Sequence, residues 1–164
     1  MTNMARRYGW SPRGQPAFAA VPFGHRKRLS VIGALGMDGM VATMTVEGAV
    51  NSAIFVAYLE EVLLPVLRLR KPDAVLVMDN LAVHTTQQVQ AVLDRSGFPY
   101  RYLPSYSPDL SPLEPAWFKM KSKLRSVGAR TVDALRQALG PALESVTSED
   151  AAGYFRHRGY SSLN

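Results

Sequence analysis

A continuously apolar run at residues 74–78, which ends at Asp79, is the feature that most constrains the fold of this chain. Such a run is typical of a central strand that is buried on both faces of an α/β sheet. A second strand is expected at residues 98–103, after a helical pattern that Gly97 ends. The strand, helix and strand in this order predict an α/β domain with a mixed sheet, in which reactive groups gather at strand ends and helix starts.

The remaining segments extend this alternation of strands and helices. Two β-prone runs, at residues 28–35 and 40–46, are joined by a turn in which Asp38-Gly39 can supply positive φ, which predicts a hairpin. A helical face begins at Asn51 and is interrupted or kinked at Pro65. Further helices are expected from Thr85 or Thr86, at residues 117–124, at residues 132–146 with a division at Gly140-Pro141, and from Ser148 in a tail at residues 147–164. We therefore expect one domain over residues 1–164, with a sheet flanked by helices.

Composition limits the classes of partner. The chain has 164 residues, of which 47% are apolar, so one ordinary domain with a hydrophobic core is expected. A formal charge of +6 favours a polyanionic partner, and nucleic acid is the first candidate, although a soluble protein can also be basic without such a partner. The absence of cysteine excludes disulfides and cysteine-ligated zinc. No segment has the unbroken apolar length of a membrane span, and we expect a cytoplasmic protein.

Two carboxylates, Asp79 and Glu114, carry the strongest functional signal, with 34 residues between them. One follows an apolar strand and the other begins a helix, so a fold that joins these ends would form a metal-binding site that faces phosphate. Asp79 could instead be a turn residue, and Glu114 could close a capping box with Ser111. Pro115 prefers the first helical position, which would leave Glu114 just outside the helix. In either arrangement Glu114 lies at the positive helix end, which favours its ionised form.

Other polar residues border these two acids. His84 and Asn80 are close enough in sequence to support Asp79, although each could be an ordinary loop residue. A basic run after Glu114 could grip phosphates or could be a solvated helix face; it contains Lys119, Lys121, Lys123 and Arg125. An extended arm at residues 1–17 could also contact phosphates and bases through Arg6, Arg7 and Arg13, which alternate with Tyr8 and Trp10.

These motifs together resemble a known family. The resemblance rests on Val77-Met78-Asp79-Asn80 with His84, on Tyr102-Leu103-Pro104, on Tyr106 to Leu110, and on Pro112-Leu113-Glu114 with Trp117. In their order and spacing these motifs resemble the segments that carry the second and third catalytic acids in the DDE transposases of bacterial insertion sequences in the mariner superfamily. The segment at residues 9–14 resembles the one that follows the first catalytic strand of that family. The likeness therefore covers roughly the whole chain as far as Leu124.

The resemblance implies a ribonuclease-H-like fold in which three carboxylates hold two divalent cations. It implies that Asp79 and Glu114 are catalytic metal ligands and that Asn80 and His84 are their neighbours. Magnesium, or manganese, is the expected ion because oxygen ligands and phosphate would dominate the site. The implied activity is DNA strand cleavage and strand transfer, with transposon ends and target DNA as partners and a homodimer as the assembly.

The first acid of the family has no counterpart in the chain. Seven aspartates are present, and none precedes Arg6, where the family has its first catalytic strand. Asp38 at a hairpin tip and Asp109 in a proline-rich loop are both better explained as turn residues. We therefore expect a catalytic domain truncated at its N-terminus, without its first strand and helix-turn-helix modules, and nearly inactive alone. Such a chain could be the second half of a frameshifted transposase or a remnant.

Two other functions remain open from the sequence. The chain could be a non-enzymatic DNA-binding module, or a fragment that associates with full-length transposase. It could also be a ribonuclease-H-like nuclease with no role in transposition. DNA binding that survives loss of both acids would favour the first alternative, and failure to join cut ends would favour the second.

Overall fold

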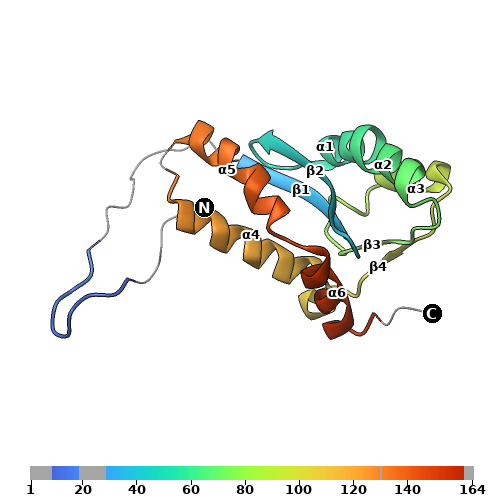
Figure 1. Ribbon diagram of the computed structural model, residues 1–164. Helices are drawn as coiled ribbons and strands as arrows, with labels where there is room; N and C mark the ends of the chain where they lie inside the picture. Colours follow the sequence, from blue (N-terminus) through green and yellow to red (C-terminus); the bar gives the residue numbers. More distant parts are fainter. Residues whose placement is uncertain (1–8, 19–28, 130, 161–164) are drawn as a thin grey trace.

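The computed structural model describes residues 9–18, 29–129 and 131–160. Its central feature is an antiparallel hairpin of β1 (Leu29–Gly36) and β2 (Gly39–Glu47), which confirms the predicted hairpin. The register shifts between Ala34 and Leu35, whose partners are Ala42 and Met40, so Val41 is an extra residue that bulges the second strand close to the turn. Gly39 has a φ of 107°, the conformation that only glycine adopts at low cost. The hairpin lies between two layers of helices (Figure 1).

The first helical layer is a continuous rod of three segments that follows the hairpin. It consists of α1 (Ser52–Ala57), the π-helical turn η1 (Tyr58–Leu63) and α2 (Leu64–Arg70). Asn51 caps its start, because its side-chain oxygen accepts a hydrogen bond of 2.9 Å from the backbone N–H of Ile54. Pro65 does not end the rod. Since proline cannot donate the usual bond to the carbonyl four residues earlier, the widened π-helical turn precedes it.

A strand–helix–strand unit follows, as predicted. It consists of β3 (Leu76–Met78), α3 (Gln87–Ser96) and β4 (Tyr100–Tyr102), with the two strands parallel. Thr86 caps α3, and Gly97 ends it in the left-handed conformation with a φ of 80°. The hydrogen-bonded partners Met78 and Tyr102 end the two strands at the same edge.

The prediction that residues 74–78 are buried on both faces was wrong. Leu76 is buried, but Val75 and Val77 remain 57% and 42% exposed. The reason is that the described residues form two separate two-stranded sheets, so no layer covers the second face of β3. One mixed sheet and an absent first strand therefore stay predictions.

The second helical layer is formed by the C-terminal part of the chain. It consists of α4 (Leu113–Val127), α5 (Val132–Glu144) and α6 (Ser148–His157), preceded by the short 3-10 turn η2 (Pro108–Leu110). The expected division at Gly140-Pro141 is absent, because α5 continues through Pro141. Gly140 has no Cβ, so the proline ring meets less steric hindrance from the residue before it.

Two hydrophobic clusters hold the layers together. The larger one joins α1, η1, α2 and α3 to one face of both sheets, through Ile32, Ala34, Met44, Leu76, Met78 and Tyr100 among others. The smaller one packs α4 and α5 against Leu29 and Val31 on the opposite face of β1. Because strand side chains alternate, one strand serves both clusters. Within the described ranges no helix is long and apolar enough to cross a membrane.

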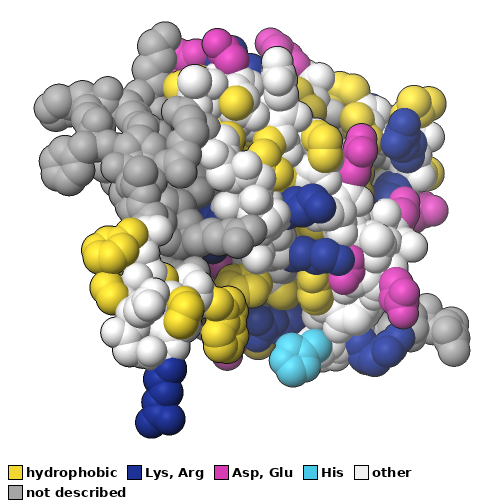
Figure 2. Space-filling model, turned by 60° about the vertical axis from the view of Figure 1, so that its left-hand side comes forward, with side chains coloured by type: hydrophobic (Ala, Val, Ile, Leu, Met, Phe, Trp, Pro, Cys, Tyr) yellow, Lys and Arg dark blue, Asp and Glu magenta, His cyan; other side chains and the backbone are white. Residues whose placement is uncertain are grey.

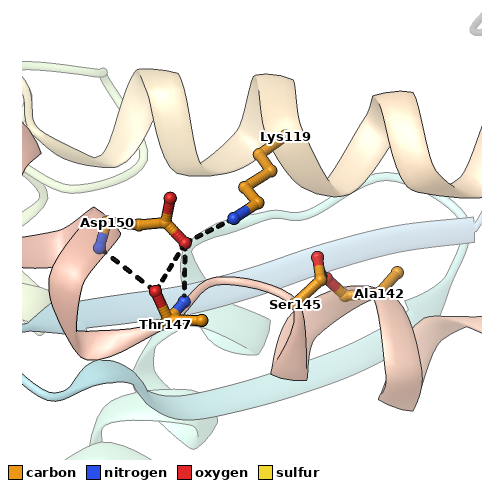
Figure 3. A network of polar contacts seen from close by, with 5 residues as sticks. All are labelled: Lys119, Ala142, Ser145, Thr147 and Asp150. Carbon is orange, nitrogen blue, oxygen red and sulfur yellow. Dashed lines mark hydrogen bonds and ion pairs between the residues drawn. The ribbon is translucent and has the colours of Figure 1, made fainter.

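Helix α6 is fixed to α4 by a network of polar contacts around Asp150 (Figure 3). The Asp150 carboxylate accepts hydrogen bonds from the Lys119 ammonium and from the backbone N–H and hydroxyl of Thr147, the latter two at 2.9 and 2.8 Å. The Thr147 hydroxyl in turn accepts from the backbone N–H of Asp150, which completes a capping box. Lys119 first, and then Thr147, lower the pKa of Asp150 to about 2.

We expect Asp150→Asn to destabilise the protein at neutral pH by about 1–2 kcal/mol, a value reduced for the partial exposure of Lys119. A carboxyl whose pKa is lower in the folded than in the unfolded state stabilises above its unfolded pKa, and this stability is lost as the pH falls through the folded pKa. The difference between wild type and variant should therefore disappear between about pH 4 and pH 2. Urea unfolding at several pH values measures this difference. Glu149→Gln, in the same exposed first turn, is the matched control, and a similar pH-dependent loss there would contradict the assignment to Asp150.

Candidate functional site

The two predicted catalytic acids follow the two parallel strands. Asp79 comes directly after β3, and the loop after β4 leads to Glu114 at the start of α4. The backbone N–H of Leu103 donates to the carbonyl of Met78 at 2.8 Å, so the two chain segments are still paired where they leave the sheet. Parallel strands end at the same edge of a sheet, and functional groups of α/β folds gather there. Asp79 therefore leaves the β3–β4 pair at its carboxyl edge, and Glu114 begins the helix that follows the loop from the same edge.

His84 is held against Asp79. Its Nδ1 lies 2.6 Å from Oδ1 of Asp79, whose side chain is 52% exposed. The imidazole ring stacks on Phe55 of α1, with ring centroids 4.1 Å apart, and the Tyr102 hydroxyl donates to the His84 carbonyl at 2.8 Å. Burial, with a smaller contribution from Asp94, raises the pKa of Tyr102, so this hydroxyl stays protonated and can donate. The structure thus brings together the predicted neighbours Asp79 and His84.

Sequence reasoning assigned no role to Phe55 or Tyr102, although they fix the histidine. Phe55 is 29 residues before His84 in the sequence, and no local pattern links them. Tyr102 is part of the family-like motif, which was the one available signal. Asn80, the other predicted neighbour, donates its side-chain N–H to the Ser105 hydroxyl at 3.0 Å. That bond ties the loop after β3 to the loop after β4.

Glu114 lies inside the helix, which corrects one expectation. Helix α4 begins at Leu113 with Pro112 at its N-cap, so Glu114 is the second helical residue and Pro115 the third. The first N–H groups of a helix have no intrahelical partner, and Pro115 therefore costs no hydrogen bond there. The capping box with Ser111 is also absent, since no side chain caps this helix. Glu114 is exposed at the positive end of α4, as expected, where the helix dipole favours a carboxylate.

The basic residues of α4 lie on two different sides of the helix. At 100° per residue, Lys121 and Arg125 follow Glu114 by seven and eleven positions and share its side, whereas Lys119 and Lys123 do not. Lys119 forms the ion pair with Asp150. Lys121 and Lys123 have no ion pair within the described residues, and Nε of Arg125 has no hydrogen-bond partner there.

The other predicted DNA contacts belong to the arm. Arg6, Arg7 and Tyr8 lie outside the described residues, whereas Arg13 and Trp10 are exposed on a loop without helix or strand. This loop extends away from the helices and sheets (Figure 1). Figure 2 shows basic side chains spread among hydrophobic and acidic ones on one face, so that face has no single basic patch.

Carboxylate oxygens such as those of Asp79 and Glu114 suit a hard cation. Among the described residues, however, no third possible ligand completes a metal-binding group. Within residues 9–18, 29–129 and 131–160, no three His, Asp or Glu side chains lie close enough to hold a metal ion. Asp38, one possible substitute for the first acid, pairs with Lys71 at 2.6 Å at the hairpin tip. Asp109 lies in η2, where its carbonyl accepts a hydrogen bond from Arg158 at 2.7 Å. Neither residue is therefore part of a described group of three possible metal ligands.

The chain is similar to a known family and to several solved structures. The model of the DDE superfamily endonuclease family matches residues 1–136. A crystal structure of a pre-cleavage Mos1 transpososome is 20% identical over 92% of this chain, with a TM-score of 0.76. The Mos1 mariner paired end complex with Mn is 21% identical over 92% of the chain, also with a TM-score of 0.76. The catalytic domain of Mos1 mariner transposase is 17% identical over 80% of this chain and 73% of its own, with a TM-score of 0.69.

The extent of these matches limits what they transfer. The chain spans about half of the Mos1 protein in the first two complexes, 47% in each case. No curated protein matches the chain. The family model covers well over half of the chain, and the matched structures share its α/β fold. The chain therefore belongs to the DDE superfamily endonucleases and has the fold of the mariner transposase catalytic domain.

Proposed function

We propose that this chain is a transposase catalytic domain that cleaves and joins DNA at transposon ends by metal-dependent phosphoryl transfer. The observation that carries the proposal is the contact of His84 with Asp79 directly after β3, in a member of the DDE endonuclease family whose loop after β4 leads to Glu114. Structures with the same fold are described as paired end and strand transfer complexes, and as catalytic domains with Mn or Mg. These descriptions apply to Mos1 and support DNA and a divalent cation as partners here.

The residues fit a hard divalent cation. Asp79 and Glu114 are both exposed carboxylates, and among the described residues neither is paired with Lys or Arg. Magnesium is commonly bound by one or two carboxylates together with substrate phosphates, so two protein ligands leave room for DNA. When bound, divalent cations would neutralise the phosphate charge and activate the attacking oxygen.

The side chains around the acids would supply positioning. His84 would hold one Asp79 oxygen through its 2.6 Å contact and leave the other directed to the ligand. The bond between Asn80 and Ser105 would keep the two loops at a fixed separation. Lys121 and Arg125 would contact phosphates of a DNA strand that runs along α4 from Glu114. The helix rises about 1.5 Å per residue, which spaces the two cations along that DNA strand.

The salt dependence of DNA binding tests these contacts. Replacing Lys121 or Arg125 by alanine should lower the slope of log K against log salt concentration by roughly 1, because each change removes one phosphate contact. Lys123→Ala, which removes the same charge from another side of α4, should change the slope less. Fluorescence anisotropy over a range of salt concentrations measures the slopes, and equal effects of all three changes would contradict a contact surface on the Glu114 side.

A cleavage assay tests the function itself. Two ligands of a site built for three should hold metal weakly, so we expect the polypeptide of residues 1–164 to nick DNA slowly in Mg²⁺ or Mn²⁺. A form extended at its N-terminus by a strand that ends in aspartate should cleave faster and should join the cut ends. DNA binding without cleavage in both forms, unaffected by Asp79→Ala and Glu114→Ala, would show a non-enzymatic DNA-binding module instead.

A further inference from the structure

Tyr106 is held in a conformation that packing does not explain. Its φ of 58° is the one positive value among the described residues other than glycine. A side chain other than glycine in this region costs about 1–2 kcal/mol. The side chain is also fully exposed, with a relative exposure of 102%, so no buried contact offsets that cost. Strain of this kind is concentrated at functional sites.

The loop that carries Tyr106 is tied to the loop that follows Asp79. Ser105, its neighbour, accepts the hydrogen bond from Asn80, which follows Asp79 directly. Pro104 and Pro108 restrict the backbone on both sides of Tyr106, and the 3-10 turn η2 begins at Pro108. The exposed ring is therefore presented by a stiff loop between the two carboxylates in sequence.

A second exposed aromatic side chain lies just after Glu114. Phe118 is 71% exposed and follows Glu114 by four residues, so it lies one helical turn further on the same side of α4. Lys121 and Arg125 continue that side. Glu114, an aromatic ring and two cations therefore follow one another along one side of α4.

We propose that Tyr106 and Phe118 stack on the bases of unpaired nucleotides beside the scissile phosphate, so that the site takes a DNA end that has been opened. Aromatic rings interleaved with cations bind single-stranded nucleic acid, because every base presents a π-face and the cations follow the phosphates. In an intact duplex these faces are hidden by neighbouring bases. The proposal rests on the proposed function and adds the state of the substrate.

Binding of designed DNA ends tests the proposal without cleavage. The probes are two duplexes of roughly 30 base pairs, whose last three base pairs are either matched or mismatched and carry 2-aminopurine, studied in Ca²⁺ in place of Mg²⁺. Wild type should bind the mismatched end about tenfold more tightly, since stacking on one ring is worth about one factor of ten or more in affinity. It should also quench 2-aminopurine fluorescence in that end.

Variants separate the rings from the fold. Tyr106→Asn removes the ring and tolerates the positive φ, and Phe118→Ala removes the other ring; each should reduce the preference to about twofold and restore the fluorescence. Tyr106→Phe keeps the ring and should behave as wild type. Leu69→Ala removes another exposed apolar side chain, 81% exposed on α2, and should change nothing. Circular dichroism and thermal unfolding verify the fold of each variant.

The outcomes are distinguishable from those of the cleavage assay. Equal affinity of wild type for both ends, or an unchanged preference in Tyr106→Asn and Phe118→Ala, would overturn the stacking proposal even if metal-dependent cleavage is found. A preference that depends on the rings would support it even if no cleavage is detected, in which case only the enzymatic function fails.

Discussion

Replacing Asp79 by asparagine is expected to lower the rate of metal-dependent DNA cleavage by roughly 10²- to 10³-fold. The amide keeps the shape of the side chain but removes the charge that would bind a cation, and electrostatic stabilisation of a developing charge is usually the largest contribution to such a reaction. Glu114→Gln should have an effect of similar size. Single-turnover cleavage by the form extended with the first strand measures the rates, and calorimetric titration with Mn²⁺ should show weaker metal binding in both variants.

Asp109→Asn is the matched control for this prediction. Asp109 precedes Glu114 by five residues and is exposed, and its side chain has no ion pair among the described residues. Its change should leave cleavage within about twofold of the parent rate, since a surface carboxylate outside the metal site contributes little. Full activity of Asp79→Asn, or an equal loss in Asp109→Asn, would show that these two acids do not form the catalytic pair.

Replacing Gly39 by alanine is expected to destabilise the fold by about 3 kcal/mol or more. A Cβ at this position would lie 2.8 Å from the carbonyl oxygen of Val146, which is backbone and cannot rotate away. The φ of 107° adds its own cost for any residue with a Cβ. Relief would require the hairpin turn to separate from the segment between α5 and α6, which would also strain the Asp150 network. Chemical unfolding monitored by circular dichroism measures the change.

Gly48→Ala separates the two contributions. Gly48 has a similar φ of 99°, but a Cβ there would meet nothing within 4 Å. Its replacement should therefore cost only the backbone strain, about 1–2 kcal/mol. Equal losses of stability in the two variants would show that the close approach of Gly39 to the Val146 carbonyl adds nothing to the cost of a Cβ at that position.

Local rules in the sequence were sufficient for many elements. The hairpin turn at Asp38-Gly39, a helix cap at Thr85 or Thr86 and the helix end at Gly97 were all predicted, because each depends on a few consecutive residues and on one side chain or one positive φ. The structure selects Thr86 as the cap. The same kind of rule failed for α4 and α5. Positional preferences of proline are averages over many helices. Pro115 lies in the first turn of α4, where backbone N–H groups have no partner within the helix, and Pro141 follows a glycine in α5.

The candidate site shows the same division. The sequence indicated Asp79, Asn80, His84 and Glu114 as a group through their order and spacing, and the contact between Asp79 and His84 agrees with this. It could not indicate that Phe55 supports the histidine, nor that Lys119 binds Asp150, since these partners are separated by 29 and 31 residues. The sequence also could not show that the basic residues of α4 lie on two sides of the helix relative to Glu114, because it did not show that Glu114 lies inside the helix.

The sequence by itself therefore determined the order of strands and helices, the hairpin turn and the helix end at Gly97, and it indicated Asp79 and Glu114 as the candidate acids. Those features depend on backbone geometry and on the side-chain chemistry of neighbouring residues. Only the tertiary structure decided which faces are covered, as the exposed Val75 and Val77 show, and which charges are already paired. Burial and pairing depend on segments that are distant in sequence and are brought together by packing of the whole chain, which no local pattern contains.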